Sequence, residues 1–365
     1  MNNKYQICTR CIMDNASDNT IVFDEKGVCN YCNKAFEQKK VKYFPNEEGK
    51  FKLNSLLTKL KTEGRGKKYD CLMGISGGLD SSYLIYLGYK WGLRILAVHI
   101  DDGFDTEISK LNIEKLVKAT NIDYIVDKPD TIQYNALIKA YLMAGVPNLA
   151  IPQDNILFAS LYHYARKYKI KNFLSGGNFA LESILQRGNT YRAFDLTNIK
   201  AIHKQFGTEP INKLPLLSDY RRFIDQKLLK IKTYRPLNLI DYNRKQALKE
   251  LSDFCGFEYY GSKHLENTLT KFIQVYWFFN KFGVDKRRSH LSSMIVSDQM
   301  TREEALQELQ KPIYNEKEME LEILQICNKL KISKEDLEKV MKSKPKQHTD
   351  YKIDKFYILF KKIFY

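Results

Sequence analysis

A stretch of seven residues, Ser76-Gly77-Gly78-Leu79-Asp80-Ser81-Ser82, combines the residue types best suited to chemistry. The apolar residues that precede it, from Cys71, predict a buried strand of a parallel sheet, and the residues that follow it predict a helix. Adjacent glycines let the backbone approach a ligand closely, and the free N–H groups at a helix start attract anions. This combination suits pyrophosphate. The alternative is an ordinary glycine-rich turn between a strand and a helix.

The stretch is not a Walker A loop, because the Gly-Lys-[Ser/Thr] ending is absent. It resembles the PP-loop of ATP pyrophosphatases, which split ATP between the α and β phosphates and leave AMP on a substrate oxygen. The resemblance implies catalytic roles for Asp80, which would help to hold Mg²⁺, and for Ser81. It also implies that the nucleotide and its pyrophosphate contact Ser76, Gly77, Gly78, Asp80, Ser81 and Ser82.

Four of the seven cysteines lie near the start of the chain, as Cys8-x-x-Cys11 and Cys29-x-x-Cys32. Two close pairs at this separation can supply four thiolates to one tetrahedral zinc ion. Two disulfides are the alternative, but a cytoplasmic protein keeps its thiols reduced. We therefore expect a closed, structural Zn²⁺ site.

The composition narrows the possible partners. The formal net charge is +16 over 365 residues, which favours anionic ligands. Much of the lysine is scattered along helical segments, so the charge alone does not predict nucleic-acid binding. A small anionic substrate is equally compatible with a net charge of +16. No run of about 18 apolar residues occurs, and the polar N-terminus does not resemble a secretion signal. We expect a cytoplasmic protein that does not bind a membrane.

Alternating strand and helix patterns follow the glycine-rich stretch. They predict a doubly wound parallel α/β sheet of the PP-loop ATP pyrophosphatase, or adenine nucleotide α-hydrolase-like, type. Further strands are expected at 93–100, 124–126 and 171–175, with helices at 109–120, 132–144 and 156–169. Beyond about residue 195 helices dominate, at 216–232, 243–254, 268–282 and 301–310. We expect a zinc-binding segment over 1–45, a helix and linker over 46–68, the α/β core over 69–200, and a helical substrate or partner region over 201–365.

Two further strand ends carry polar residues, and ligands of open α/β sheets bind beyond the carboxyl ends of the strands. An acidic turn, Asp101-Asp102-Gly103-Phe104-Asp105, follows the second strand; one of its carboxylates is a candidate for Mg²⁺ or ribose, unless it serves its own turn. A second glycine-rich sequence, Ser175-Gly176-Gly177-Asn178, should face the same cleft. The candidates for nucleotide or metal contacts are Asp101, Asp154, Gly176, Asn178 and Glu182.

A set of charged residues in the C-terminal region is a candidate site for an anionic substrate. Their spacing shows no helical periodicity, so a role in a site and a structural role are equally compatible with the sequence. The candidates are Lys263, His264, Glu266, Arg287, Arg288 and His290.

Several motifs together resemble the N-acetyl sugar amidotransferases. They are Cys8-Thr9-Arg10-Cys11-Ile12-Met13-Asp14, Cys29-Asn30-Tyr31-Cys32, the PP-loop, Arg287-Arg288-Ser289-His290-Leu291-Ser292-Ser293-Met294-Ile295 and Gln299-Met300-Thr301-Arg302-Glu303-Glu304-Ala305. Enzymes of this family act in bacterial surface-polysaccharide (O-antigen) and nonulosonic-acid biosynthesis. They convert an N-acetyl group of a nucleotide-activated sugar into an acetamidino group. The segment 185–213 matches no part of the family pattern that we can place.

The resemblance implies ATP, Mg²⁺ and Zn²⁺ as cofactors. AMP transferred to the amide oxygen would create a leaving group that ammonia can displace. Because no cysteine stands in a glutaminase motif, the ammonia would come from a partner. The resemblance implies that this partner is a separate class I glutaminase with a cyclase-like companion subunit.

Two other functions compete with this interpretation. A PP-loop enzyme that thiolates tRNA would use the same loop, and the positive net charge would favour tRNA binding. Such enzymes generally need further cysteines in the core. A non-catalytic zinc-ribbon interaction protein would not need the intact Asp80 and serines of the loop.

Overall fold

The structure is a computed structural model that describes residues 4–261 and 265–364. Its centre is a five-stranded sheet in the order β3-β2-β1-β4-β5. Every neighbouring pair of strands is parallel. The strands are β1 (Cys71–Gly74), β2 (Ile95–Ile100), β3 (Asp123–Asp127), β4 (Asn172–Leu174) and β5 (Lys232–Tyr234).

Helices cover both faces of the sheet, as a parallel sheet requires. Alternate side chains of the central strands point to opposite faces: Met73 packs with α3 and α4, whereas Leu72 and Val98 pack with α6. The helices around the sheet are α3 (Leu79–Lys90), α4 (Glu107–Thr120), α6 (Ile151–Lys167), α9 (Asp219–Lys227) and α10 (Arg244–Cys255). The predicted doubly wound α/β fold is confirmed.

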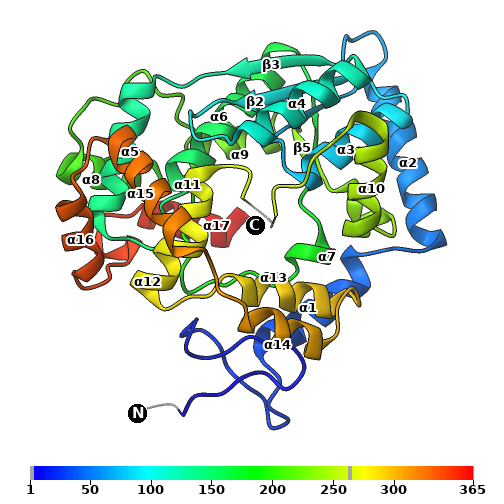
Figure 1. Ribbon diagram of the computed structural model, residues 1–365. Helices are drawn as coiled ribbons and strands as arrows, with labels where there is room; N and C mark the ends of the chain where they lie inside the picture. The colour runs from blue at the N-terminus through cyan, green and yellow to red at the C-terminus, as the bar shows by residue number, and fades with distance from the viewer. Residues whose placement is uncertain (1–3, 262–264, 365) are drawn as a thin grey trace.

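A second core is built mainly from helices. Trp277 and Tyr141 are among its fully buried side chains, and its elements lie to one side of the sheet (Figure 1). They are α5 (Thr131–Ala144), α8 (Leu196–Phe206), α11 (Thr268–Lys271), the π-helix η2 (Phe272–Trp277), α12 (Phe278–Phe282), α15 (Glu316–Leu330) and α16 (Lys334–Lys342).

The N-terminal cysteine segment packs against the C-terminal region. Its helix α1 (Asn30–Lys42) contacts α13 (Arg287–Val296), which in turn contacts α7 (Phe179–Glu182) and α14 (Arg302–Gln310). Figure 1 shows this group below the sheet, with the helical core on the left. The remaining elements are α2 (Glu47–Gly64), η1 (Pro236–Leu239), η3 (His348–Asp350) and α17 (Lys355–Phe364).

One helix prediction is wrong. Residues 216–232 were expected to form a single helix, but α9 ends at Lys227 and the chain then forms the edge strand β5. A three-residue edge strand that begins with lysine has neither the length nor the apolar pattern of a recognisable strand. In the described part of the chain, no helix has the length and apolar character needed to cross a membrane.

Candidate active site

The PP-loop connects β1 to α3 and lies at the carboxyl end of the strands. Gly77 has a φ of +73°, and a Cβ atom there would lie 2.4 Å from the carbonyl oxygen of Ser109, so only glycine fits. The Ser81 hydroxyl donates to the Gly78 carbonyl at 3.1 Å and accepts from the Ser76 N–H at 3.3 Å. The loop is thus preformed around the start of α3, whose first backbone N–H groups have no acceptor within the helix itself.

The second glycine-rich strand end lies directly against this loop. A Cβ atom on Gly176 would lie 2.9 Å from the backbone nitrogen of Ser81, so a side chain there would displace the PP-loop. Asn178 shapes the turn: it donates to the Gly176 carbonyl at 3.1 Å and caps α7 by accepting from the Leu181 N–H at 2.9 Å. The structure therefore brings the two predicted loops together.

A cavity of about 220 Å³, here called the loop cavity, opens where the two loops meet. Eight of the residues singled out in the sequence line it: Ser76, Gly78, Asp80, Ser81, Gly176, Glu182, Glu266 and His290. The other lining residues are Leu79, Gly177, Leu181, Arg244, Tyr259 and Tyr260.

The sequence analysis missed Arg244, Tyr259 and Tyr260 as lining residues of the loop cavity, and Tyr242 as a partner of Asp80. Tyr242 donates a hydrogen bond to Asp80, and burial together with this carboxylate holds the pKa of Tyr242 well above its usual value. The Tyr260 hydroxyl accepts from the Leu79 N–H at 3.0 Å, and Arg244 donates to the Tyr259 hydroxyl. The only sequence signal was the Tyr259-Tyr260 pair just before the predicted Lys263 and His264, both of which lie outside the described residues.

A larger cavity of about 480 Å³, here called the strand-end cavity, lies beyond the end of β2. It shares Ser76 and Glu266 with the loop cavity, and Ser76 donates to Glu266 at 3.4 Å between them. Its polar walls include His99, Asp102, Asp105, Gln153, Asp154 and Lys286. The rest is largely apolar, so this space suits a ligand with a nonpolar body and a few polar groups.

His99 lies in the wall of this cavity, held between two hydrogen-bond acceptors. One ring nitrogen lies 2.9 Å from the Ile75 carbonyl oxygen and the other 2.9 Å from Asp105. A carbonyl and a carboxylate oxygen both accept, so this geometry favours the doubly protonated ring. Burial opposes this charge, but the bonds to Asp105 and Ile75 prevail and raise the pKa of His99.

Asp102 ties three elements to the end of β2. Its carboxylate accepts hydrogen bonds from Tyr134 at 2.9 Å, Gln153 at 2.7 Å and Asn267 at 3.0 Å, which belong to α5, α6 and the start of α11. Burial and the nearby Asp105 raise the pKa of Asp102. The acidic turn thus fixes the shape of the strand-end cavity.

Only some of the residues predicted to contact the nucleotide or a metal ion line a cavity. Asp154 lines the strand-end cavity, where burial raises its pKa to about 6. Asp101 instead forms an ion pair with Lys128 at 2.7 Å and is not among the residues that line the described cavities. The fully buried Ser82 side chain points into the protein rather than into the loop cavity. Contacts of Asp101 and Ser82 with the nucleotide stay predictions.

A third cavity of about 150 Å³, here called the α13 cavity, shares Glu182 and His290 with the loop cavity. Arg287 lines it but is held by Asp285 at 2.7 Å. Arg288 faces away, pairing with Asp14 at 3.0 Å and donating to the Ile12 carbonyl at 2.7 Å. The two arginines predicted to bind substrate therefore have protein partners, and their contact with substrate stays a prediction.

The four N-terminal cysteines converge. Their Sγ atoms all lie within 4.8 Å of one another, and Cys11 and Cys29 are 3.8 Å apart. A tetrahedral zinc ion with Zn–S bonds of about 2.3 Å requires sulfurs roughly 3.8 Å apart. Cys8 Sγ accepts from the N–H groups of Cys11 and Cys29, as metal thiolates commonly do. These residues could hold one tetrahedral ion, and all four are free thiols rather than disulfides.

The cysteine segment also contacts the walls of the cavities. Arg302 of α14 donates to the carbonyls of Cys8 and Cys11, both at 3.1 Å. Asp18 accepts from the Gly188 N–H at 3.2 Å, and a Cβ atom on Gly188 would lie 2.4 Å from this carboxylate. The 184–190 loop overlaps the start of the segment 185–213, which matched no part of the family pattern. It lies between the cysteine segment and the strand-end cavity, to which it contributes Leu185 and Thr190.

Comparison with known proteins identifies the C-terminal region. Residues 266–364 match the family described as LPS biosynthesis protein WbpG-like, C-terminal domain. That range contains Glu266, Lys286 and His290, which line the cavities. No curated protein matches the chain.

Solved structures resemble the chain distantly. NMN synthetase from Francisella tularensis is 18% identical with a TM-score of 0.29, covering 65% of this chain and 96% of its own. The NH3-dependent NAD synthetase from Campylobacter jejuni is 14% identical with a TM-score of 0.31, covering 57% of this chain and 93% of its own. The U34-tRNA thiolase NcsA from Methanococcus maripaludis is 13% identical with a TM-score of 0.34, covering 81% of this chain and 88% of its own. Similarity at this level transfers no activity.

Proposed function

We propose that the chain is an ATP-dependent N-acetyl sugar amidotransferase, because residues 266–364 match the WbpG-like C-terminal domain. It would convert an N-acetyl group of a nucleotide-activated sugar into an acetamidino group, in the cytoplasm, for a bacterial surface polysaccharide or nonulosonic acid. The observation that carries the proposal is the meeting of two glycine-rich strand ends, Asp80 and Glu266 around one cavity.

The reaction needs an activated amide, because nitrogen donation into the carbonyl makes an amide a poor electrophile. The amide oxygen would attack the α-phosphorus of ATP, and the bond to pyrophosphate would break. Ammonia would then attack the resulting imidate carbon, and AMP would leave with the former amide oxygen as a proton is lost. The net result is an amidine, AMP and pyrophosphate.

The residues of the loop cavity suit the first step. The N–H groups at the start of α3, with the hydroxyls of Ser76 and Ser81, would bind the departing pyrophosphate. Asp80, oriented by Tyr242, would hold Mg²⁺, which supplies positive charge against the phosphates. Glu182 and Glu266 line the same cavity and are further carboxylate candidates for the metal or for a substrate hydroxyl.

The four cysteines would hold a structural zinc ion. All four side chains are fully buried, so no ligand position faces the loop cavity. The ion would fix the segment that packs on α13 and on the 184–190 loop, and it would take no part in the chemical step.

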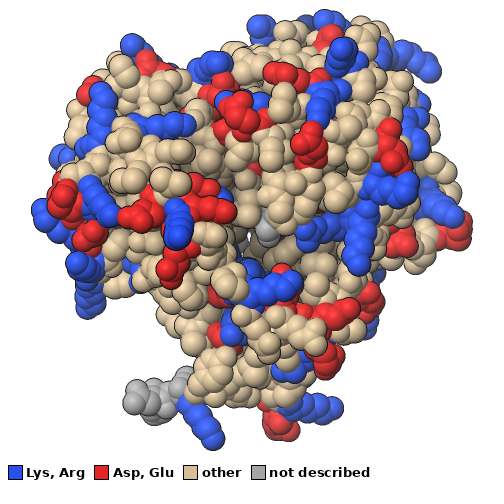
Figure 2. Space-filling view, viewed as in Figure 1, with Lys and Arg blue, Asp and Glu red and all other residues tan. Residues whose placement is uncertain are grey.

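The tRNA thiolation alternative needs a reactive thiol near the PP-loop. Cys71 is fully buried within β1, and burial raises the pKa of its thiol. Burial also raises the pKa of Cys255 and Cys327. The visible face of the molecule mixes lysine and arginine with acidic residues around the central hollow (Figure 2), which fits a small anionic substrate better than a long polyanion.

Mass spectrometry of a nucleotide-activated N-acetyl sugar, incubated with the protein, ATP, Mg²⁺ and ammonium, tests the proposal directly. Exchange of an amide oxygen for NH lowers the mass by about one unit, with AMP and pyrophosphate as co-products. Release of pyrophosphate only with tRNA and a sulfur donor would contradict the proposal and favour thiolation.

A further inference from the structure

Lys286 is a cation that lines two cavities, and within the described ranges 4–261 and 265–364 no carboxylate forms an ion pair with it. It lines both the strand-end cavity and the α13 cavity, and its ammonium group lies 5.1 Å from the centre of the Phe278 ring. Among residues 4–261 and 265–364, no carboxylate or carbonyl oxygen forms a hydrogen bond or ion pair with it. Lys286 was not among the residues singled out in the sequence.

The two cationic residues that follow Lys286 both have carboxylate partners. Lys286, Arg287 and Arg288 stand together at the start of α13, where Asp285 accepts from the Arg287 N–H at 3.0 Å and so satisfies the helix end. Arg287 is neutralised by Asp285 at 2.7 Å, and Arg288 by Asp14 at 3.0 Å. Asp18, whose charge reaches Lys286, already accepts hydrogen bonds from Tyr31 and Thr20. Lys286 alone is left for a ligand.

We propose that the Lys286 ammonium group, in the wall shared by the strand-end and α13 cavities, binds an anionic group of the sugar substrate. The inference rests on the proposed function for the identity of that substrate. The chemistry is that of a phosphate or carboxylate oxygen, supplied either by the diphosphate of the nucleotide carrier or by an acidic group on the sugar ring.

The position of Lys286 suits this role. It stands in the wall shared by the strand-end and α13 cavities, and both cavities adjoin the loop cavity where AMP transfer would occur. An anion held there would anchor the substrate away from the reacting amide and leave the PP-loop to ATP. Burial lowers the pKa of Lys286 to about 8, so the amine is still mainly charged near neutral pH.

Calorimetry on the full chain tests the site without turnover. With saturating α,β-methylene ATP and Mg²⁺ to fill the loop cavity, UDP is titrated in one arm and glucuronate in the other. We expect the wild-type chain to bind at least one probe, and Lys286→Met to weaken that binding by about tenfold or more, which corresponds to roughly 1.4 kcal/mol. The probe that binds identifies the source of the anion.

Three variants serve as controls. Lys286→Arg should restore most of the affinity, and Lys334→Met, which removes an exposed lysine paired with Glu320, should bind as the wild type does. Lys286→Gln replaces the methionine variant if that variant fails to fold. A wild-type chain that binds neither probe, or a Lys286→Met chain that binds as tightly as the wild type, overturns the proposal. A chain that binds through Lys286 yet yields no acetamidino sugar refutes the proposed activity alone.

Discussion

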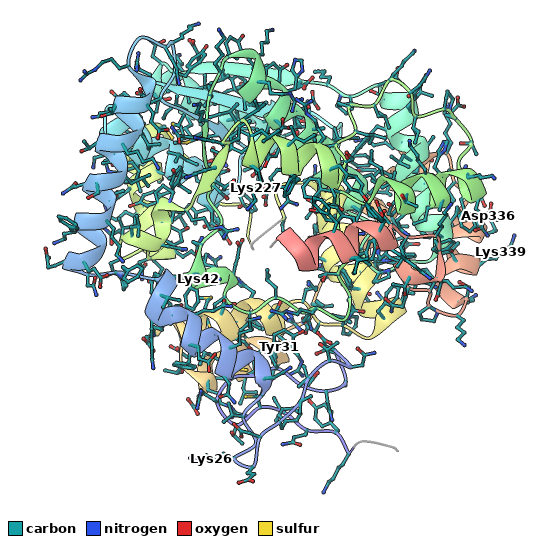
Figure 3. All side chains as sticks on the ribbon, turned by 180° about the vertical axis from the view of Figure 1, so that it is seen from behind. Lys26, Tyr31, Lys42, Lys227, Asp336 and Lys339 are labelled. Atoms are coloured by element: carbon teal, nitrogen blue, oxygen red, sulfur yellow. The ribbon has the colours of Figure 1, made fainter. Side chains whose placement is uncertain are left out.

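The hydroxyl of Tyr31 accepts a hydrogen bond from the backbone N–H of Arg187 at 2.7 Å, which joins the cysteine segment to the 184–190 loop. Tyr31 lies in the first turn of α1 and is labelled in Figure 3, where α1 is seen against α13. The same hydroxyl donates to Asp18 at 2.8 Å, and Asp18 accepts from the Gly188 N–H. One phenol therefore connects the metal-binding segment to a wall of the candidate active site.

We expect Tyr31→Phe to loosen this wall. Removing one partner leaves buried groups unpaired, at a cost of roughly 1–3 kcal/mol. Hydrogen exchange should accelerate at 184–190 but not at 71–82, and KM for the sugar should rise more than KM for ATP. Tyr69→Phe is the matched control, because it removes a hydroxyl bonded to Asp123 at 2.6 Å, at the opposite end of the strands. Equal effects of the two variants on the 184–190 loop would contradict the link.

The purified protein should carry close to one zinc ion per chain, and Cys29→Ser should lose it. A structural zinc site contributes on the order of 10 kcal/mol in small zinc domains, so loss of one of four buried thiolates should lower the melting temperature clearly. Metal analysis and thermal melts check this. Cys327→Ser, in the helical core, is the control and should keep the metal. Metal-free protein that melts like the wild type would exclude the site.

Asp80→Asn should reduce pyrophosphate release from ATP at least about 100-fold while leaving the melting temperature nearly unchanged. A neutral amide cannot compensate charge that develops on the pyrophosphate through the metal. Tyr242→Phe removes only the phenol that orients Asp80, so its loss should be smaller. Equal activity of Asp80→Asn and the wild type would show that the nucleotide binds at another site.

The sequence predicted the part of the site that one local segment encodes. The run from Cys71 to Ser82 contains strand, turn and helix start, so its conformation follows from neighbouring residues. Tyr242 contacts Asp80 across 162 positions of the chain, and no local pattern signals such a contact. For the same reason Arg287 and Arg288 looked available for substrate, since nothing nearby in the sequence shows that Asp14 would fold back onto Arg288.

The strands of the sheet likewise divide into those that a local sequence pattern predicts and one that it does not. β1 to β4 were predicted because short apolar runs alternate with helical patterns in the sequence. β5, Lys232–Tyr234, is a short edge strand with two exposed residues, and its place beside β4 depends on the packing of the whole chain. The 184–190 loop, without secondary structure, could be placed only through its contacts with Asp18 and Tyr31.

Asp154→Asn should change how stability depends on pH. The carboxyl has a pKa of about 6 in the folded protein against 3.8 in the reference state. Between these values the folded state binds more protons than the unfolded state, so the contribution of Asp154 to the free energy of unfolding falls as pH rises from 3.8 to 6. The asparagine variant should lack this contribution and be more stable than the wild type at pH 7, when both are free of ligand and metal.

Thermal melts of both proteins from pH 4 to 8 measure the difference. Burial lowers the pKa of His348 to about 3, so its contribution to the free energy of unfolding falls as the pH falls. This contribution is the same in both proteins and cancels in the comparison. A difference between the two proteins that does not vary with pH would show that Asp154 is not desolvated in the strand-end cavity.

The isolated chain should use ammonium salts and ignore glutamine. A glutaminase needs a thiolate next to a base. Cys8, Cys11, Cys29 and Cys32 belong to the buried cluster, and burial raises the pKa of Cys71, Cys255 and Cys327. Amidine formation should therefore increase with pH as ammonium loses its proton, and added glutamine should have no effect.

Addition of a separate class I glutaminase with its cyclase-like companion should restore the use of glutamine near neutral pH. A catalytically inactive glutaminase is the control, because it can bind but cannot release ammonia. Cys255→Ser tests the most exposed of the isolated thiols and should leave both activities unchanged. Glutamate released from glutamine by the chain alone would contradict the prediction, and loss of that release in Cys255→Ser would identify a nucleophile inside this chain. With ammonia supplied from outside, the chain has only to hold the sugar, the nucleotide and the metal in place, and its buried thiols are free to serve structure.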